Sequence, residues 1–108
     1  MRRQPDILAE IKYFETKDGG RRTPAKTGFR PQVKFEISEK TTSGHQNFVD
    51  KEFVFPGETI IAEVIFLSPH FFSGMLEVGM SFNIQETINH IGYGKILKII
   101  NEDLRACI

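Results

Sequence analysis

The chain has 108 residues, of which 40% are hydrophobic and 26% charged, and its formal net charge at pH 7 is zero. This length has room for one domain, which we expect to span residues 1–108, and the composition excludes wholesale disorder. No apolar run approaches the roughly 20 residues of a membrane helix or forms a signal peptide, so we expect a cytoplasmic protein without membrane contact. The single cysteine, Cys107, cannot form an intramolecular disulfide, which agrees with a reducing compartment.

Alternating apolar and polar residues predict strands along most of the chain. Residues 7–13 and 33–37 alternate as strands do when one face is buried. Residues 38–50 are polar and rich in turn-forming types, and we expect a mobile loop there. After Phe53, Phe55 and the Pro56-Gly57 turn, residues 59–67 carry apolar side chains on both faces, which predicts a strand buried on both sides.

Two further strands are expected at residues 78–85 and 91–100. Gly92 and Gly94 lie inside the second of these, which indicates tight coiling or a close approach of another backbone. No window sustains helical periodicity for three turns, so the fold class is all-β. Strands of this number and spacing usually close into a small barrel or a sandwich. We predict a small closed six-stranded antiparallel β-barrel, because closure removes exposed sheet edges.

An apolar segment, residues 68–76, interrupts the strand pattern and is bounded by proline and glycine. We expect it to fold back over one end of the barrel as a plug or lid, with a partner-binding tip as the alternative. The side chains that would form the plug are Phe71, Phe72, Met75 and Leu76.

Positive charge is concentrated between Lys17 and Lys34, where six basic residues accompany one acid, Asp18. Such a cluster either binds a polyanion or simply keeps a surface loop solvated, and composition alone does not separate the two. The basic residues are Lys17, Arg21, Arg22, Lys26, Arg30 and Lys34.

Sequence signals for catalysis or cofactor binding are missing. There is no Gly-x-x-x-x-Gly-Lys-Ser/Thr loop to hold nucleotide phosphates, and Gly92-Tyr93-Gly94-Lys95 lacks its spacing. The three histidines are scattered and no cysteine pair exists, so no metal-ligand spacing is present. We therefore expect a non-enzymatic protein with no cofactor, no metal and no bound GTP.

Four separated motifs occur in a characteristic order. Gly19-Gly20-Arg21-Arg22-Thr23-Pro24 is followed by Gly28-Phe29-Arg30-Pro31-Gln32, by Pro56-Gly57-Glu58, and by Phe82 to Lys95 with its Gly92-x-Gly94. In this order they resemble the third, C-terminal β-barrel domain of bacterial elongation factor Tu over most of the chain. The resemblance implies a detached barrel module related to translation, without the GTPase domain or the second barrel of the factor.

The resemblance also implies a binding site. In that family the barrel helps to hold the T-stem of aminoacyl-tRNA, mainly through backbone and ribose contacts. Arg21, Arg30, Gln32 and Glu86 match the family, whereas Arg22 replaces a histidine, Phe29 a tyrosine, Gln85 an arginine, and Thr87-Ile88 a glycine pair. The predicted partner is tRNA or other structured RNA, and the alternative is a protein partner of elongation factor Tu. The predicted site residues are Arg21, Arg22, Lys26, Phe29, Arg30, Gln32, Gln85 and Glu86.

Overall fold

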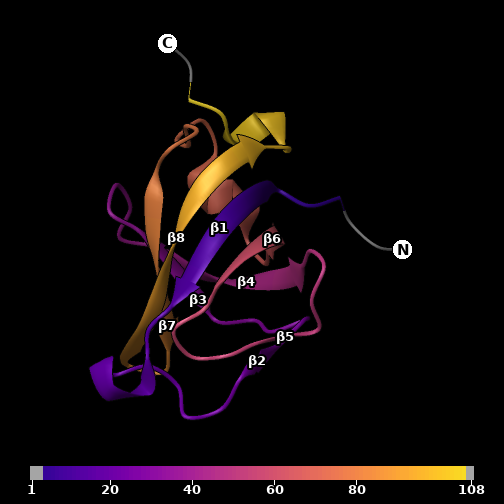
Figure 1. Ribbon diagram of the computed structural model, residues 1–108. Helices are drawn as coiled ribbons and strands as arrows, with labels where there is room; N and C mark the ends of the chain where they lie inside the picture. Colours follow the sequence, from indigo (N-terminus) through magenta and orange to yellow (C-terminus); the bar gives the residue numbers. More distant parts are fainter. Residues whose placement is uncertain (1–3, 107–108) are drawn as a thin grey trace.

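Six antiparallel strands close into a barrel in this computed structural model, which describes residues 4–106 (Figure 1). The order around the barrel is β1 (Ile7–Tyr13), β6 (Thr59–Phe66), β4 (Thr41–Phe48), β3 (Gln32–Phe35), β7 (Ser81–Glu86) and β8 (Asn89–Ile99). Two short strands outside the barrel, β2 (Ala25–Lys26) and β5 (Phe53–Val54), pair as a two-stranded ribbon. The described residues also form three short 3-10 helices: η1 (Thr16–Asp18), η2 (Pro69–Phe72) and η3 (Glu102–Leu104). The predicted closed six-stranded antiparallel barrel is confirmed. Cys107 lies outside the described residues.

Closure depends on β1, which pairs with β6 on one side and β8 on the other. The two glycines of β8 make room for close neighbours. A side chain at Gly92 would place its Cβ 2.5 Å from the Lys12 carbonyl oxygen, and one at Gly94 would lie 2.2 Å from the Phe82 ring. Both distances are far below van der Waals contact. The predicted close approach of another backbone is confirmed at Gly92, whereas at Gly94 the close neighbour is a side chain. Within residues 4–106, no helix is long and apolar enough to cross a membrane.

The η2 helix lies toward the upper end of the barrel in Figure 1. Aromatic side chains pack together there. Phe72 from η2 is fully buried, with its ring centroid 4.9 Å from that of Phe35 and 5.2 Å from that of Phe66. Leu76 is also fully buried, whereas Phe71 is half-buried and Met75 is exposed. The predicted plug is therefore confirmed for Phe72 and Leu76, and it was wrong for Met75.

The prediction of a mobile loop at residues 38–50 was wrong, because Thr41–Phe48 forms β4 between β3 and β6. The buried residues of this strand, Thr42, Gly44 and Gln46, are polar or lack a side chain. Gln46 is buried, and its Oε1 accepts a hydrogen bond from the Tyr13 hydroxyl at 2.5 Å. At Gly44 a Cβ would lie 2.8 Å from Val33 Cγ2, so only glycine fits without displacement. The strand is buried without the apolar alternation that usually reveals one.

The prediction that residues 59–67 form a strand buried on both sides was wrong. A barrel strand turns only alternate residues inward, so the outward residues of β6 are half-buried at most, and Leu67 just beyond it is 75% exposed. Two strands are also shorter than expected: β3 ends at Phe35, and β7 begins at Ser81. Ile37 and Val78 therefore lie in exposed turns instead of strands.

Candidate nucleic-acid interface

Gln32 in β3 lies directly opposite Gln85 in β7. Their strand neighbours Val33 and Ile84 are fully buried. Because successive strand residues point to opposite faces, both glutamines are directed outward. The register between β3 and β7 thus brings together two predicted site residues from distant motifs.

Two contacts hold Arg21 at the end of β7, which is next to the glutamine pair in sequence, and neither contact is with a glutamine. Its guanidinium carbon lies 4.4 Å from the ring centroid of Phe29, and its Nε lies 3.6 Å from Glu86 Oε1. Only 20% of the Arg21 side chain is exposed. We call Arg21, Gln32, Gln85 and Glu86 the Gln32–Gln85 surface. It includes half of the predicted site residues, with the two glutamines on the outer face of the strands and the Arg21–Glu86 pair at the adjoining end of the barrel.

The glycines before Arg21 let the loop pack tightly against the end of β1. Gly19 has φ +92°, the left-handed region in which side chains are strained. A Cβ at Gly20 would lie 2.1 Å from the Phe14 carbonyl oxygen. The Thr16 hydroxyl donates to the Arg21 carbonyl oxygen at 2.6 Å, which fixes the backbone from which Arg21 projects.

Support for Phe29 comes from the barrel interior. Its ring centroid is 6.3 Å from that of Tyr13, which is buried and donates to Gln46. Burial raises the pKa of the Tyr13 hydroxyl well above its ordinary value of 10.0, the hydrogen bond to Gln46 opposing this, so the hydroxyl is neutral. A continuous set of contacts therefore connects the interior of the barrel with Arg21.

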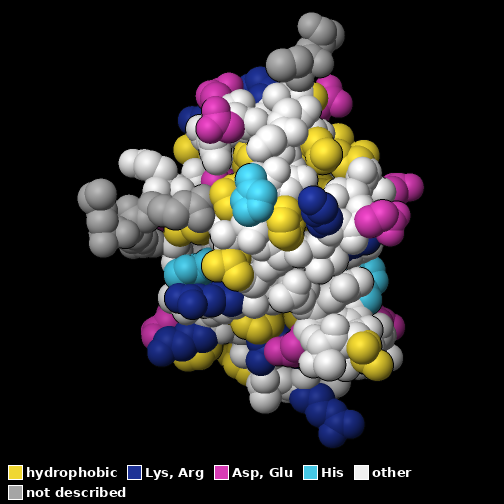
Figure 2. Space-filling model, turned by 180° about the vertical axis from the view of Figure 1, so that it is seen from behind, with side chains coloured by type: hydrophobic (Ala, Val, Ile, Leu, Met, Phe, Trp, Pro, Cys, Tyr) yellow, Lys and Arg dark blue, Asp and Glu magenta, His cyan; other side chains and the backbone are white. Residues whose placement is uncertain are grey.

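The basic loop is less positive at its surface than its composition suggests. Lys17 is 3.6 Å from Glu15, and Lys26 of the ribbon is 3.7 Å from Glu52. Lys34 donates to the carbonyl oxygens of Phe35 and Ser38. On the face behind that of Figure 1, Figure 2 shows Lys and Arg side chains among hydrophobic and acidic ones.

Arg22 and Arg30 complete the predicted set, and both are exposed. Among the described residues neither forms an ion pair. Arg30 borders a hollow on the outer face of β4 and β6, whereas Lys26 lies on the separate β2–β5 ribbon. The structure thus gathers Arg21, Phe29, Gln32, Gln85 and Glu86 and leaves the other three predicted residues in different surroundings.

Comparison with known families decides the relationship. The family model of the elongation factor Tu C-terminal domain matches residues 1–100 of the 108-residue chain. The chain belongs to this family. The match confirms the resemblance seen in the motifs and places the chain among translation-related modules, in a family whose domain is non-catalytic.

The sequence analysis did not predict a cluster of three aromatic side chains on the surface of this elongation factor Tu-type barrel. The Phe14 ring lies 5.0 Å from His90 and 6.0 Å from Tyr93, centroid to centroid. Ile88, in the turn between β7 and β8 and two residues before His90, is 91% exposed. Hairpin turns normally carry polar residues or glycine, so an isoleucine there was the signal that could have drawn attention to this end of the barrel.

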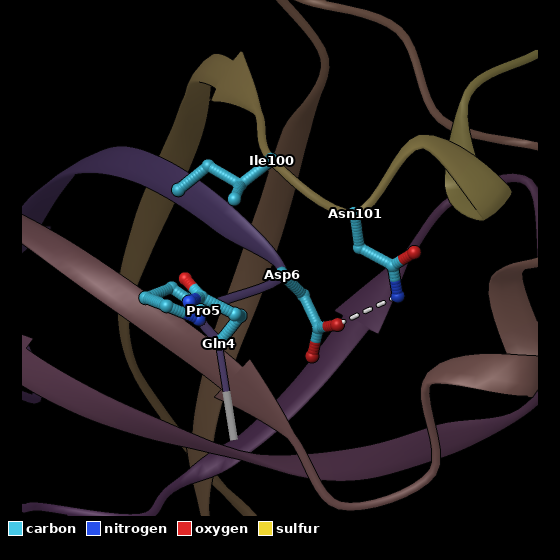
Figure 3. Close-up of a pocket in the computed structure, with 5 residues that line it drawn as sticks. All are labelled: Gln4, Pro5, Asp6, Ile100 and Asn101. Carbon is cyan, nitrogen blue, oxygen red and sulfur yellow. Dashed lines mark hydrogen bonds between the residues drawn. The ribbon is translucent and has the colours of Figure 1, made fainter. Parts of the chain in front are cut away.

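Another hollow, of about 450 Å³, lies where β1 begins and β8 ends (Figure 3). The Asp6 side chain in it is already engaged: Oδ1 accepts from Asn101 Nδ2 at 2.9 Å, and Oδ2 accepts from the Phe66 N–H at 2.8 Å. The carboxylate thus ties together three segments of the elongation factor Tu-type barrel. Within residues 4–106, no group of three His, Cys, Asp or Glu residues is placed to hold a metal ion.

Proposed function

We propose that this chain is a non-enzymatic binding module that contacts tRNA or other structured RNA through the Gln32–Gln85 surface, with Arg22 alongside. The observation that supports this is the direct opposition of Gln32 and Gln85, together with an Arg21 that is fixed on Glu86, the residue after Gln85. Glutamine amides both donate and accept hydrogen bonds, which suits ribose hydroxyls, and a guanidinium suits phosphate. Backbone and ribose contacts of this kind are how A-form helices are recognised.

Affinity for RNA should be modest. The net charge is zero, and Arg21 already has a carboxylate partner. If Arg21 and Arg22 each meet one phosphate, counterion release predicts that binding weakens about tenfold between about 50 and 200 mM salt. A much steeper salt dependence would require more phosphate contacts than this surface offers.

The test is fluorescence anisotropy with a labelled RNA hairpin whose stem is a regular A-form helix. Gln85→Ala and Arg22→Ala should each weaken binding without changing its preference among stem sequences, because such contacts position rather than specify. Lys98→Ala, which removes an exposed cation from β8, serves as the matched control. Equal affinity of the wild type and the Gln85→Ala, Arg22→Ala double variant at low salt would dispose of the proposal.

A second candidate function is protein interaction, in which the module imitates the third domain of elongation factor Tu toward protein partners of that factor. The exposed Ile88 and the neighbouring aromatic rings favour it, because such side chains are enriched at the centres of protein interfaces. An apolar interface would show little dependence on salt. For either function we expect no GTP binding, which titration calorimetry with GTP checks.

A further inference from the structure

A hollow of about 220 Å³ lies on the outer face of β4 and β6, one strand further round the barrel from Gln32. The register places His45 opposite Ile65, and the Leu67 N–H donates to the Ser43 carbonyl oxygen at 3.0 Å. Arg30, two residues before β3, completes the rim. The residues around the hollow are Arg30, Ser43, His45, Ile65, Phe66 and Leu67.

The apolar part of the hollow is formed by β6. Leu67 follows the last residue of the strand and is 75% exposed, and Ile65, two residues earlier on the same face, is half-buried. A single exposed leucine on a protein surface is common. Here, however, Leu67 and a second aliphatic side chain, Ile65, line the same concavity. The shape and the lining suit one aliphatic side chain from a partner.

Arg30 gives the hollow its charge. It is exposed and, among the described residues, forms no ion pair. Arg21 and Lys26 differ, because each has a carboxylate within 3.7 Å. No acidic residue lines the hollow. An uncompensated guanidinium beside an apolar concavity is complementary to a ligand that carries a carboxylate next to an aliphatic group.

Pairing within the barrel limits how a ligand is held. β4 is hydrogen-bonded to β3 and β6, and β6 to β4 and β1, so neither offers a free edge for an added strand. Recognition must therefore use side chains. Arg30, Ser43 and His45 can meet either a peptide or RNA. The aliphatic groups of Ile65 and Leu67 offer ribose and phosphate nothing, and this apolar part of the lining favours a peptide at this position.

We propose that this hollow binds a peptide segment of a partner protein, in which an aliphatic side chain packs on Ile65 and Leu67 while an adjacent carboxylate meets Arg30. The site lies beside the Gln32–Gln85 surface but uses different residues. It does not depend on RNA binding.

The probe is a phage-displayed library of random peptides selected on the folded chain. Selection should enrich sequences in which Asp or Glu stands next to Leu, Ile or Val. For a synthetic copy of an enriched peptide, Leu67→Ser should lower the affinity about tenfold. Ile88→Ser, which removes an even more exposed aliphatic side chain elsewhere, should leave the affinity unchanged.

The charge is tested by a double-mutant cycle. Arg30→Gln should lower the affinity for the acidic peptide about fivefold, and it should have no effect on the same peptide with its acid replaced by the amide. Lys98→Gln is the matched charge control. Additive effects of the two changes would show that Arg30 does not meet the carboxylate, and they would overturn its assigned role.

Three results would overturn the proposal as a whole. They are no enrichment, enriched peptides without acidic residues, and equal binding of the enriched peptide to Leu67→Ser. The RNA hairpin separates this site from the proposed RNA surface: Leu67→Ser should leave RNA affinity unchanged, and Gln85→Ala should leave peptide affinity unchanged. Loss of RNA binding in Leu67→Ser would assign the hollow to RNA instead.

Discussion

The ring of Phe72 lies edge-on to the ring of Phe35, with the centroids 4.9 Å apart and the planes inclined by 67°. The contact joins η2 to the inside of β3 and closes the barrel at the end away from the basic loop (Figure 1). Phe72, from the segment that interrupts the strand pattern, is therefore part of the core.

Truncation of this contact should be costly. Phe72→Ala removes a fully buried ring, and we expect the free energy of unfolding to fall by about 3–5 kcal/mol. Met75→Ala, in the same segment but at an exposed position, should change it by about 0.5 kcal/mol or less. Urea unfolding of both variants measures the difference. Similar small losses in both would mean that η2 does not seal the barrel in solution.

Asp6 provides a second test of how the barrel is held together. Asp6→Ala leaves the Phe66 N–H and the Asn101 amide without their carboxylate acceptor, and a buried donor without a partner costs about 1–3 kcal/mol. Asp103→Ala, at an exposed carboxylate of η3, is the control. Thermal melting should show a clear loss for Asp6→Ala only, and equal melting temperatures for both variants would contradict the structural role of Asp6.

Strands with alternating apolar residues could be predicted from the sequence, but β4 could not. In β1 and β3 the inward residues are apolar, so period-2 hydrophobicity reveals them. In β4 the inward positions include Thr42, Gly44 and Gln46. Burial of Gln46 depends on a hydrogen bond from Tyr13, 33 residues earlier, and a local pattern contains no trace of that contact.

The sequence motifs identified residues of the candidate site, but they predicted only some of the contacts between those residues. They included both Arg21 and Glu86, but not that the two form an ion pair, which lowers the charge available for a ligand. They also included Arg30 with Arg21, whereas Arg30 borders the hollow on β4 and β6. These outcomes depend on strand register and on the path of the loop, which tertiary packing determines.

Gly44 tests whether residues 41–48 are a packed strand. Gly44→Ala places a methyl group within 3.0 Å of side-chain atoms of Val33 and Val64, and overpacking of this kind costs about 1–3 kcal/mol. Ser43→Ala, at the adjacent outward position, should be nearly neutral. Hydrogen exchange gives an independent readout. The backbone N–H of Gln46 donates a hydrogen bond to the Phe29 carbonyl oxygen, so it should be protected from exchange. A mobile loop would tolerate both substitutions and exchange rapidly.

Tyr13 predicts a specific loss of stability at high pH. Because burial raises the pKa of its hydroxyl above the ordinary value of 10.0, the folded state keeps a proton that the unfolded state releases. The free energy of unfolding is therefore unaffected by this hydroxyl below pH 10. Above pH 10 it falls as the pH rises, by about 1.4 kcal/mol per pH unit.

Tyr13→Phe removes this ionisation together with the hydrogen bond to Gln46. The variant should be less stable than the wild type at neutral pH by about 1–3 kcal/mol, because the buried Gln46 Oε1 loses its donor. Above pH 10 the gap should narrow, since only the wild type is penalised by the buried hydroxyl. Tyr93→Phe, at an exposed tyrosine, should follow the wild type at every pH. Urea unfolding at a series of pH values measures all three proteins, and a gap that stays constant through the alkaline range would show that Tyr13 ionises as readily in the folded barrel as in the unfolded chain.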